Sequence, residues 1–125
     1  MRALWIALSI VAFGAGCGKN DTPETAAECQ ADYLRTIDKS CTTPADCVLV
    51  GHQDCCGTIE VSVRIGSEAA AADAEQTYEA CVACPPTGCF HADESEDMMT
   101  PSTGQRIISV CTANRCSSTV ATLTP

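Results

Sequence analysis

The cysteine-rich stretch from Cys41 to Gly57 constrains the fold of this chain more than any other feature, because it ends in two adjacent cysteines. Consecutive Cα atoms lie about 3.8 Å apart, whereas the two halves of a disulfide usually have Cα atoms about 4.4–6.8 Å apart. Cys55 and Cys56 are therefore expected to bond to different partners and not to each other. The pair would then tie one point of the chain to two distant elements.

The amino-terminal residues predict export from the cytoplasm. Arg2 precedes an apolar run over residues 3–13, and small residues then lead to Cys17. A basic start, a short apolar run and small residues at a cleavage site are the features of a signal peptide. The run is too short to cross a bilayer as a helix, which needs about 20 apolar residues. We therefore interpret residues 1–16 as a signal peptide.

The end of this segment, FGAGC at residues 13–17, resembles the lipobox of bacterial lipoproteins. In that family a signal peptidase cuts before a cysteine that has received a diacylglyceryl group. The resemblance implies that Cys17 carries the lipid and that residues 17–23 form a tether to the membrane. Gly18 stands where inner-membrane lipoproteins of enteric bacteria have Asp, which implies the outer membrane. The alternative is ordinary cleavage near Gly16, with release into the periplasm or full secretion.

Cysteine content also indicates an oxidising destination. The chain has 11 cysteines, and lipidation of Cys17 would leave ten, an even number. Cysteines at this density in a short exported chain are typical of a disulfide framework. Only two Phe, two Tyr and one Trp are present, so disulfides are expected to hold the fold together. The predicted disulfide cysteines are Cys29, Cys41, Cys47, Cys55, Cys56, Cys81, Cys84, Cys89, Cys111 and Cys116.

The sequence alone does not determine how these cysteines pair. The working hypothesis combines short-range loops with long-range links from the adjacent pair. It joins Cys41 to Cys47, Cys84 to Cys89, and Cys55 and Cys56 to Cys81 and the C-terminal hairpin.

Two helices are predicted. The first has Thr22 as its cap and Pro23 in the first helical position, and it ends near residues 38–40. Its expected buried face consists of Ala26, Cys29, Tyr33, Leu34 and Ile37. The second helix follows Ser67 as a cap and covers residues 68–81. Its expected buried face consists of Ala70, Ala74, Tyr78 and Cys81.

Four strands are expected. Residues 48–50 are a short apolar run, and residues 58–65 alternate cleanly between apolar and polar side chains, as a half-buried strand does. Near the carboxyl end, residues 106–111 and 116–123 flank a turn at residues 112–115, where Asn114 can adopt the left-handed conformation of a hairpin.

The order of these elements favours a single α+β domain over residues 24–125. We expect a small disulfide-rich fold with a mainly antiparallel sheet of about four strands and two helices on one face. Residues 87–104 show no period, and a loop of this length in a compact domain is either functional or mobile. Its acidic cluster at residues 93–97 lacks the ligand spacing of a calcium loop and is expected to be a solvated charge run.

Two patterns bear on chemistry. Cys81 and Cys84 form a CxxC at the carboxyl end of the predicted helix, whereas reactive pairs of this kind lie at a helix amino terminus, where the dipole stabilises the thiolate. Structural disulfides are therefore favoured over a thiol–disulfide enzyme. His91, Met98 and Met99 are candidate soft ligands for copper, with incidental side chains on an exposed loop as the favoured interpretation. No zinc-ligand spacing occurs, and neither a catalytic residue nor a cofactor is predicted.

The charge of the chain excludes one class of partner. Seven basic and 16 acidic side chains give a net charge of −9. A negative surface repels the phosphate backbone, so nucleic acid is not an expected partner. The charge favours a well-solvated surface or contact with a basic protein.

A resemblance extends from Cys41 to Cys116, where C-x5-C, CCG, an alanine-rich helix and a C-x4-C hairpin follow one another. This order resembles that of uncharacterised small cysteine-rich lipoproteins of Gram-negative, myxobacteria-like bacteria. The resemblance implies architecture and the lipid on Cys17, and it implies no activity. We expect a lipid-anchored, non-catalytic interaction or structural domain that offers residues 87–104 to an envelope or extracellular protein. The alternatives are a protease-inhibitor-like binder and an extracytoplasmic protein that handles thiols and disulfides, or copper or zinc.

Overall fold

A computed structural model describes residues 25–124 of the chain. The predicted signal peptide, Cys17 as the predicted site of the lipid, and the predicted tether lie outside the described residues. The elements, in chain order, are α1 (Ala26–Thr36), a short 3-10 helix (Pro44–Asp46), β1 (Cys47–Gln53), β2 (Thr58–Arg64), α2 (Glu68–Cys81), β3 (Glu94–Ser95), β4 (Gln105–Thr112) and β5 (Arg115–Thr122).

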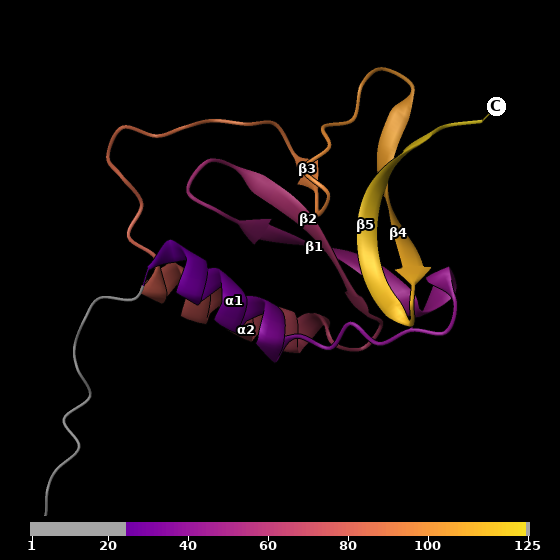
Figure 1. The fold of residues 1–125 in the computed structure, drawn as a ribbon, viewed down its shortest axis with the longest axis horizontal. Helices are drawn as coiled ribbons and strands as arrows, with labels where there is room; N and C mark the ends of the chain where they lie inside the picture. Colours follow the sequence, from indigo (N-terminus) through magenta and orange to yellow (C-terminus); the bar gives the residue numbers. More distant parts are fainter. Residues whose placement is uncertain (1–24, 125) are drawn as a thin grey trace, which may run out of the picture.

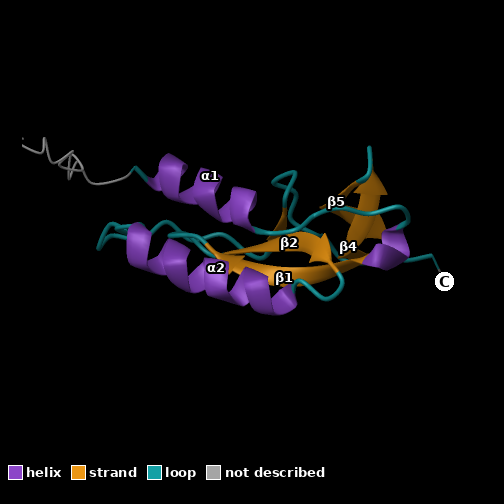
Figure 2. Cartoon of the chain, turned by 90° about the horizontal axis from the view of Figure 1, so that it is seen from below, coloured by secondary structure: helices purple, strands orange, loops and turns teal. Residues whose placement is uncertain are grey.

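The domain has three layers (Figures 1 and 2). Strands β1 and β2 form an antiparallel hairpin in the middle, both helices lie on one face of it, and the β4–β5 hairpin packs beside it. The short strand β3 adds to β2 in parallel. The α+β class and the placement of the helices are confirmed. The strands, however, are divided between a three-stranded and a two-stranded sheet, because the β4–β5 hairpin packs against β1 and β2 without pairing with either strand.

Helix α1 begins at a capping box. Thr25 accepts a hydrogen bond from the Glu28 N–H, and the Glu28 carboxylate accepts one from the Thr25 N–H at 2.7 Å. These two bonds satisfy donors that the first turn leaves without partners. The predicted start at Thr22 and Pro23 is therefore wrong, as is the predicted end near residues 38–40, because Ile37 is already extended.

The core lies between the helices and β2. Cys29 and Tyr33 of α1, with Ile37 just after the helix, are buried against Val61 and Val63 of β2, as predicted. The predicted faces are wrong at three positions, because Ala26 and Ile65 are exposed and Ser62, a polar position of the β2 alternation, is fully buried. Helix α2 adds Ala71, Ala74 and Tyr78. Ala70, which was predicted to be buried, is exposed. The small alanine side chains let α2 lie close to its neighbours.

One fully buried polar residue crosses this core. The His52 ring stacks on Tyr33 with ring centroids 4.1 Å apart, and it meets the Tyr78 ring in a T-shaped arrangement with centroids 4.4 Å apart. Its Nδ1 lies 2.7 Å from the Glu75 carboxylate and its Nε2 lies 2.7 Å from the Gln30 side-chain oxygen. Since both ring nitrogens have partners, the histidine is accommodated without an unsatisfied polar group. This arrangement joins β1 to both helices.

Five disulfides join segments that are far apart in the sequence. The pairs are Cys29–Cys81, Cys41–Cys111, Cys47–Cys116, Cys55–Cys84 and Cys56–Cys89. The predicted short-range pairs Cys41–Cys47 and Cys84–Cys89 are wrong, and so are the predicted links from Cys55 and Cys56 to Cys81 and the hairpin.

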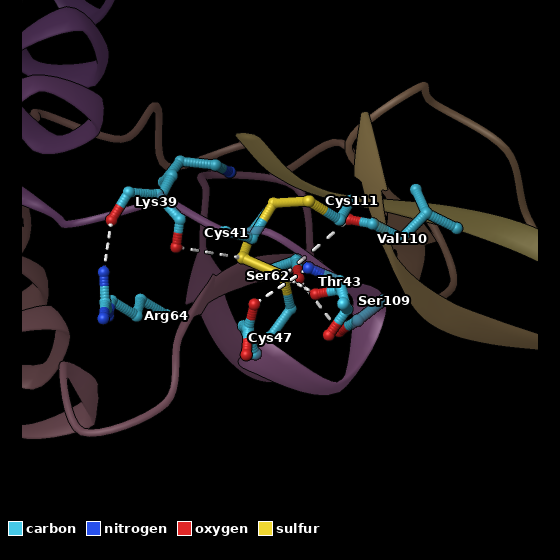
Figure 3. Close-up of a disulfide and its surroundings, with 12 residues drawn as sticks. Lys39, Cys41, Thr43, Cys47, Ser62, Arg64, Ser109, Val110 and Cys111 are labelled. Atoms are coloured by element: carbon cyan, nitrogen blue, oxygen red, sulfur yellow. Dashed lines mark hydrogen bonds between the residues drawn. A yellow bond between two sulfur atoms is a disulfide. The ribbon is translucent and has the colours of Figure 1, made fainter. Parts of the chain in front are cut away.

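Two of these pairs, Cys41–Cys111 and Cys47–Cys116, form because the β4–β5 hairpin packs against the 41–47 segment. Cys111 and Cys116 are cross-strand neighbours on β4 and β5, and each reaches a different cysteine of the 41–47 segment. Figure 3 shows the Cys41–Cys111 disulfide with the Cys47 sulfur beside it. Sulfurs of Cys41, Cys47 and Cys116 lie within 4.8 Å of one another and are buried. This sulfur cluster is the second small core of the domain.

Within residues 25–124, no helix is both long and apolar enough to cross a membrane.

Candidate functional site

The 87–104 loop is the main candidate for a functional surface. It follows α2, passes along the sheet and leads through β3 into β4 (Figure 1). Its first part, up to Phe90, is exposed at every position, whereas parts of residues 91–96 are half-buried or buried. Three sets of contacts hold it.

The first set is covalent and comes from the adjacent cysteines. Cys55 bonds to Cys84, just after α2, and Cys56 bonds to Cys89 within the loop. The prediction that the two neighbours would bond to different partners is confirmed. The turn after β1 therefore holds both the base and the exposed part of the loop.

The second set surrounds His91. Its backbone N–H donates to the Cys56 carbonyl at 3.0 Å, and its ring Nε2 lies 3.2 Å from the Asp54 carboxylate. Asp54 in turn accepts hydrogen bonds from the N–H groups of Cys56 and Gly57, each at 2.7 Å. One carboxylate thus organises the turn and binds the loop to it.

These contacts shift two pKa values. The ring of His91 faces the Ala92 carbonyl at 2.7 Å as well as Asp54, and both interactions raise the pKa of His91 above its usual value. Burial acts to raise the pKa of Asp54, but the N–H groups of Cys56 and Gly57 and the His91 ring outweigh it and lower that pKa. The His91 ring and the Asp54 carboxylate therefore each favour the charged form of the other, and their contact holds the loop to the turn.

We expect this attachment to depend on pH. Because the folded state raises the pKa of His91, the contribution is fully present below the unfolded pKa of about 6.5 and is lost as pH rises through the folded value. In an NMR titration, the His91 ring protons should titrate at higher pH in the wild type than in Asp54→Asn. Equal midpoints in the two proteins would contradict the role given to Asp54.

Gly57 is required where the turn meets the loop. A Cβ at this position would lie 2.7 Å from the His91 carbonyl oxygen, which is closer than such atoms approach. We expect Gly57→Ala to displace the loop and to lower the free energy of unfolding by about 1–3 kcal/mol, the usual cost of overpacking. Gly88→Ala is the matched control, because its Cβ meets nothing within 4 Å. Urea unfolding of both oxidised variants measures the difference, and equal stabilities would refute the contact.

The third set is a buried ion pair. Lys39 is only 4% exposed, and its ammonium donates to the Glu96 carboxylate. The second oxygen of Glu96 accepts the N–H groups of Ser62 on β2 and Ser118 on β5, at 3.0 and 2.9 Å. Burial lowers the pKa of Lys39, and the bond to Glu96 acts against that shift. Glu96 therefore joins β2 of one sheet to β5 of the other.

The acidic cluster is thus not the solvated charge run that the sequence predicted. Besides Glu96, Asp97 accepts a hydrogen bond from Thr119 on β5 at 2.8 Å and one from Ser95, which is fully buried. The side-chain hydrogen bonds of Asp97 lower its pKa. Within residues 93–97, Asp93 is exposed and makes no such contact.

Between these anchors the loop exposes large apolar side chains. Phe90 is 91% exposed, and it lies directly between Cys89, which is bonded to Cys56, and His91. Met98 and Met99 are also exposed, and Met98 adopts a left-handed backbone conformation. A phenylalanine held in water by a rigid scaffold costs solvation free energy that burial in a partner would recover.

The candidate metal and thiol chemistry finds little support in this geometry. Both ring nitrogens of His91 already face acceptors, Nδ1 the Ala92 carbonyl and Nε2 the Asp54 carboxylate, so neither nitrogen points outward to bind copper. Cys81 and Cys84 belong to two different disulfides and do not form a reversible pair with each other. The clustered sulfurs of Cys41, Cys47 and Cys116 are likewise held in disulfides.

A hollow lies between the two helices. It has a volume of about 180 Å³ and is lined by the buried Tyr33 and Tyr78 and the exposed Asp32 and Asp73, among others. Among the described residues, every buried side-chain nitrogen or oxygen already has a hydrogen-bond partner. No polar group therefore awaits a ligand there.

The sequence indicates the loop but not the residues that define it, which are Phe90, Asp54, Lys39 and Glu96. Phe90 had one usable signal, an aromatic residue next to a cysteine in a polar segment. Lys39 and Glu96 carry no such signal in the sequence, because they lie 57 positions apart.

Comparison of the chain with protein-family models, with curated proteins and with solved structures found no match.

Proposed function

We propose that this chain is an exported, lipid-anchored, non-catalytic domain that binds a protein partner in the envelope or outside the cell through the 87–104 loop. The observation that carries the proposal is the 91% exposure of Phe90 between two fixed neighbours. Cys89 is covalently attached to Cys56, and the His91 N–H is bonded to the carbonyl of the same residue.

The physical basis is preorganisation. A loop that is ordered before binding loses less conformational entropy when the complex forms. Exposed aromatic side chains are also the residues that most often anchor protein interfaces. The disulfides and the His91–Asp54 contact supply the order, and Phe90 supplies the apolar surface.

The location follows partly from the fold. A domain with five disulfides in 100 described residues is typical of an oxidising, extracytoplasmic compartment. The lipid anchor rests on the lipobox resemblance at Cys17 and on the even cysteine count that remains. An outer-membrane site rests on Gly18 in the position after that cysteine.

The binding role is tested by site-specific photo-crosslinking on intact cells. A photoreactive phenylalanine analogue at position 90 should give a discrete adduct with one protein, identified by mass spectrometry. The matched control places the same analogue at position 123, where Leu123 is another exposed apolar residue of the domain. The same adducts from both positions, or no adduct from position 90, would oppose the proposal.

The anchor is tested separately with Cys17→Ser. The wild-type protein should sediment with outer membranes and gain the mass of a diacylglyceryl cysteine. The variant should lose the lipid mass and the membrane association. A wild-type chain that is recovered soluble and unmodified would remove the lipid from the proposal and leave the loop untouched.

A further inference from the structure

We propose that the partner is a serine protease with an apolar primary specificity pocket, and that the segment Gly88–His91 binds its active site as a slowly released, substrate-like inhibitor with Phe90 in the pocket. The inference rests on the proposed function and specifies its partner. It follows from where the two anchors stand relative to a single peptide bond.

The segment has the form that a protease cleft accepts. Residues 88–93 carry no helix, strand or turn, and Gly88, Cys89 and Phe90 are all exposed. A large apolar side chain in the position before the cleaved bond is what a hydrophobic specificity pocket selects. Phe90 is the most exposed of the large apolar side chains among the described residues.

The anchors flank the Phe90–His91 bond on both sides. On the amino-terminal side, Cys89 is bonded through sulfur to Cys56. On the carboxyl-terminal side, the His91 nitrogen donates to the Cys56 carbonyl at 3.0 Å, and its ring faces Asp54. A single turn of the scaffold therefore holds both ends that a protease would separate.

This arrangement makes cleavage reversible. The protease serine oxygen would bond to the Phe90 carbonyl carbon while the bond from that carbon to the His91 nitrogen breaks. The serine proton would pass through the protease histidine to the His91 nitrogen. Because the scaffold keeps that amine in place, it attacks the acyl-enzyme at high effective concentration, returns the proton and reforms the peptide bond before water enters.

Charge complements the geometry. The segment is bordered by Asp54 and Asp93, and the whole chain has a net charge of −9. These charges disfavour insertion of Phe90 into an anionic membrane surface and favour a protein with a basic rim around its cleft.

The test uses the oxidised full-length mature chain with Cys17→Ser, assayed against chymotrypsin and trypsin on small peptide substrates. The protein with the unchanged loop should inhibit chymotrypsin and leave trypsin active. Phe90→Ala should weaken that inhibition at least about 100-fold, as expected for a central interface anchor. Phe90→Arg should transfer inhibition to trypsin, whose pocket carries an acidic residue. Met99→Ala, an exposed apolar change in the same loop, should inhibit like the wild type.

A second variant tests the anchors themselves. Cys56→Ala with Cys89→Ala removes the covalent hold and should turn the inhibitor into a substrate, with the cut between Phe90 and His91 located by mass spectrometry. Circular dichroism compared with the parent would show that the remaining disulfides keep the fold. Resistance of this variant to cleavage would overturn the reversible mechanism.

The outcomes also separate this inference from the broader proposal. Absent inhibition of chymotrypsin, inhibition that survives Phe90→Ala, or rapid cleavage of the intact loop would each overturn the protease assignment. If position 90 still crosslinks to one protein that is not a protease, the loop remains a binding site with a different partner. If position 90 gives no adduct, both proposals fail.

Discussion

Replacement of Glu96 by glutamine is expected to lower the free energy of unfolding by about 3–5 kcal/mol, the cost of breaking a buried ion pair by removing one partner. The Lys39 ammonium, whose residue is only 4% exposed, would lose its anionic partner, and the glutamine amide would face it without neutralising it. The contact between β2 and β5 should also weaken, because the Glu96 carboxylate accepts hydrogen bonds from the N–H groups of Ser62 and Ser118. Urea unfolding of the oxidised protein measures the loss.

Two controls isolate the buried charge. Asp93→Asn removes an exposed carboxylate from the same segment and should change stability by less than about 0.5 kcal/mol. Lys39→Met combined with Glu96→Gln removes the orphaned ammonium and should recover part of the stability lost in Glu96→Gln alone. If the double variant is less stable than the single one, Lys39 is not the source of the penalty.

Removal of the Cys47–Cys116 disulfide, by Cys47→Ala with Cys116→Ala, is expected to cost about 4 kcal/mol. The bridge spans 69 positions, and the entropy of an unfolded chain rises with the length of the loop that is released. Cys116 is fully buried in the sulfur cluster, so the variant also leaves a void in that small core. For a domain of this size the melting temperature should fall by roughly 20 °C.

The matched comparison is Cys56→Ala with Cys89→Ala. That bridge spans 33 positions, and Cys89 is exposed, so its removal releases a shorter loop and leaves no buried void. We expect a loss nearer to about 3 kcal/mol, concentrated in the exposed part of the loop. Calorimetry of the two variants gives both values. A smaller loss from the buried bridge than from the exposed one would contradict this account.

The cysteines are predictable from the sequence in one respect and not in another. The adjacent pair allowed one firm deduction, that Cys55 and Cys56 bond to different partners, because covalent geometry alone excludes the alternative. The partners themselves were predicted wrongly. Closure entropy favours short loops such as Cys41 to Cys47. The β4–β5 hairpin, however, packs against the 41–47 segment and brings together cysteines that lie 70 and 69 positions apart, and this contact determines the pairing.

The prediction that the acidic cluster at residues 93–97 is solvated was wrong for a related reason. A run of carboxylates is usually solvated, and nothing near Glu96 in the sequence indicates a partner. Only the approach of Lys39, together with the N–H groups of β2 and β5, makes burial of this carboxylate favourable. Local pattern describes what a residue prefers, whereas the energy of a charge depends on what surrounds it.

Sequence by itself determined the α+β class, the approximate positions of both helices and of four strands, the hairpin turn at Asn114 and the disulfide-rich character of the domain. These properties follow from periodicity, turn chemistry and composition, which are local. Tertiary structure alone decided the pairing of the cysteines, the division of the strands into two sheets, the ion pair of Lys39 and Glu96, and the exposure of Phe90. Each of these depends on distances between segments remote in the chain, and no local preference specifies such distances.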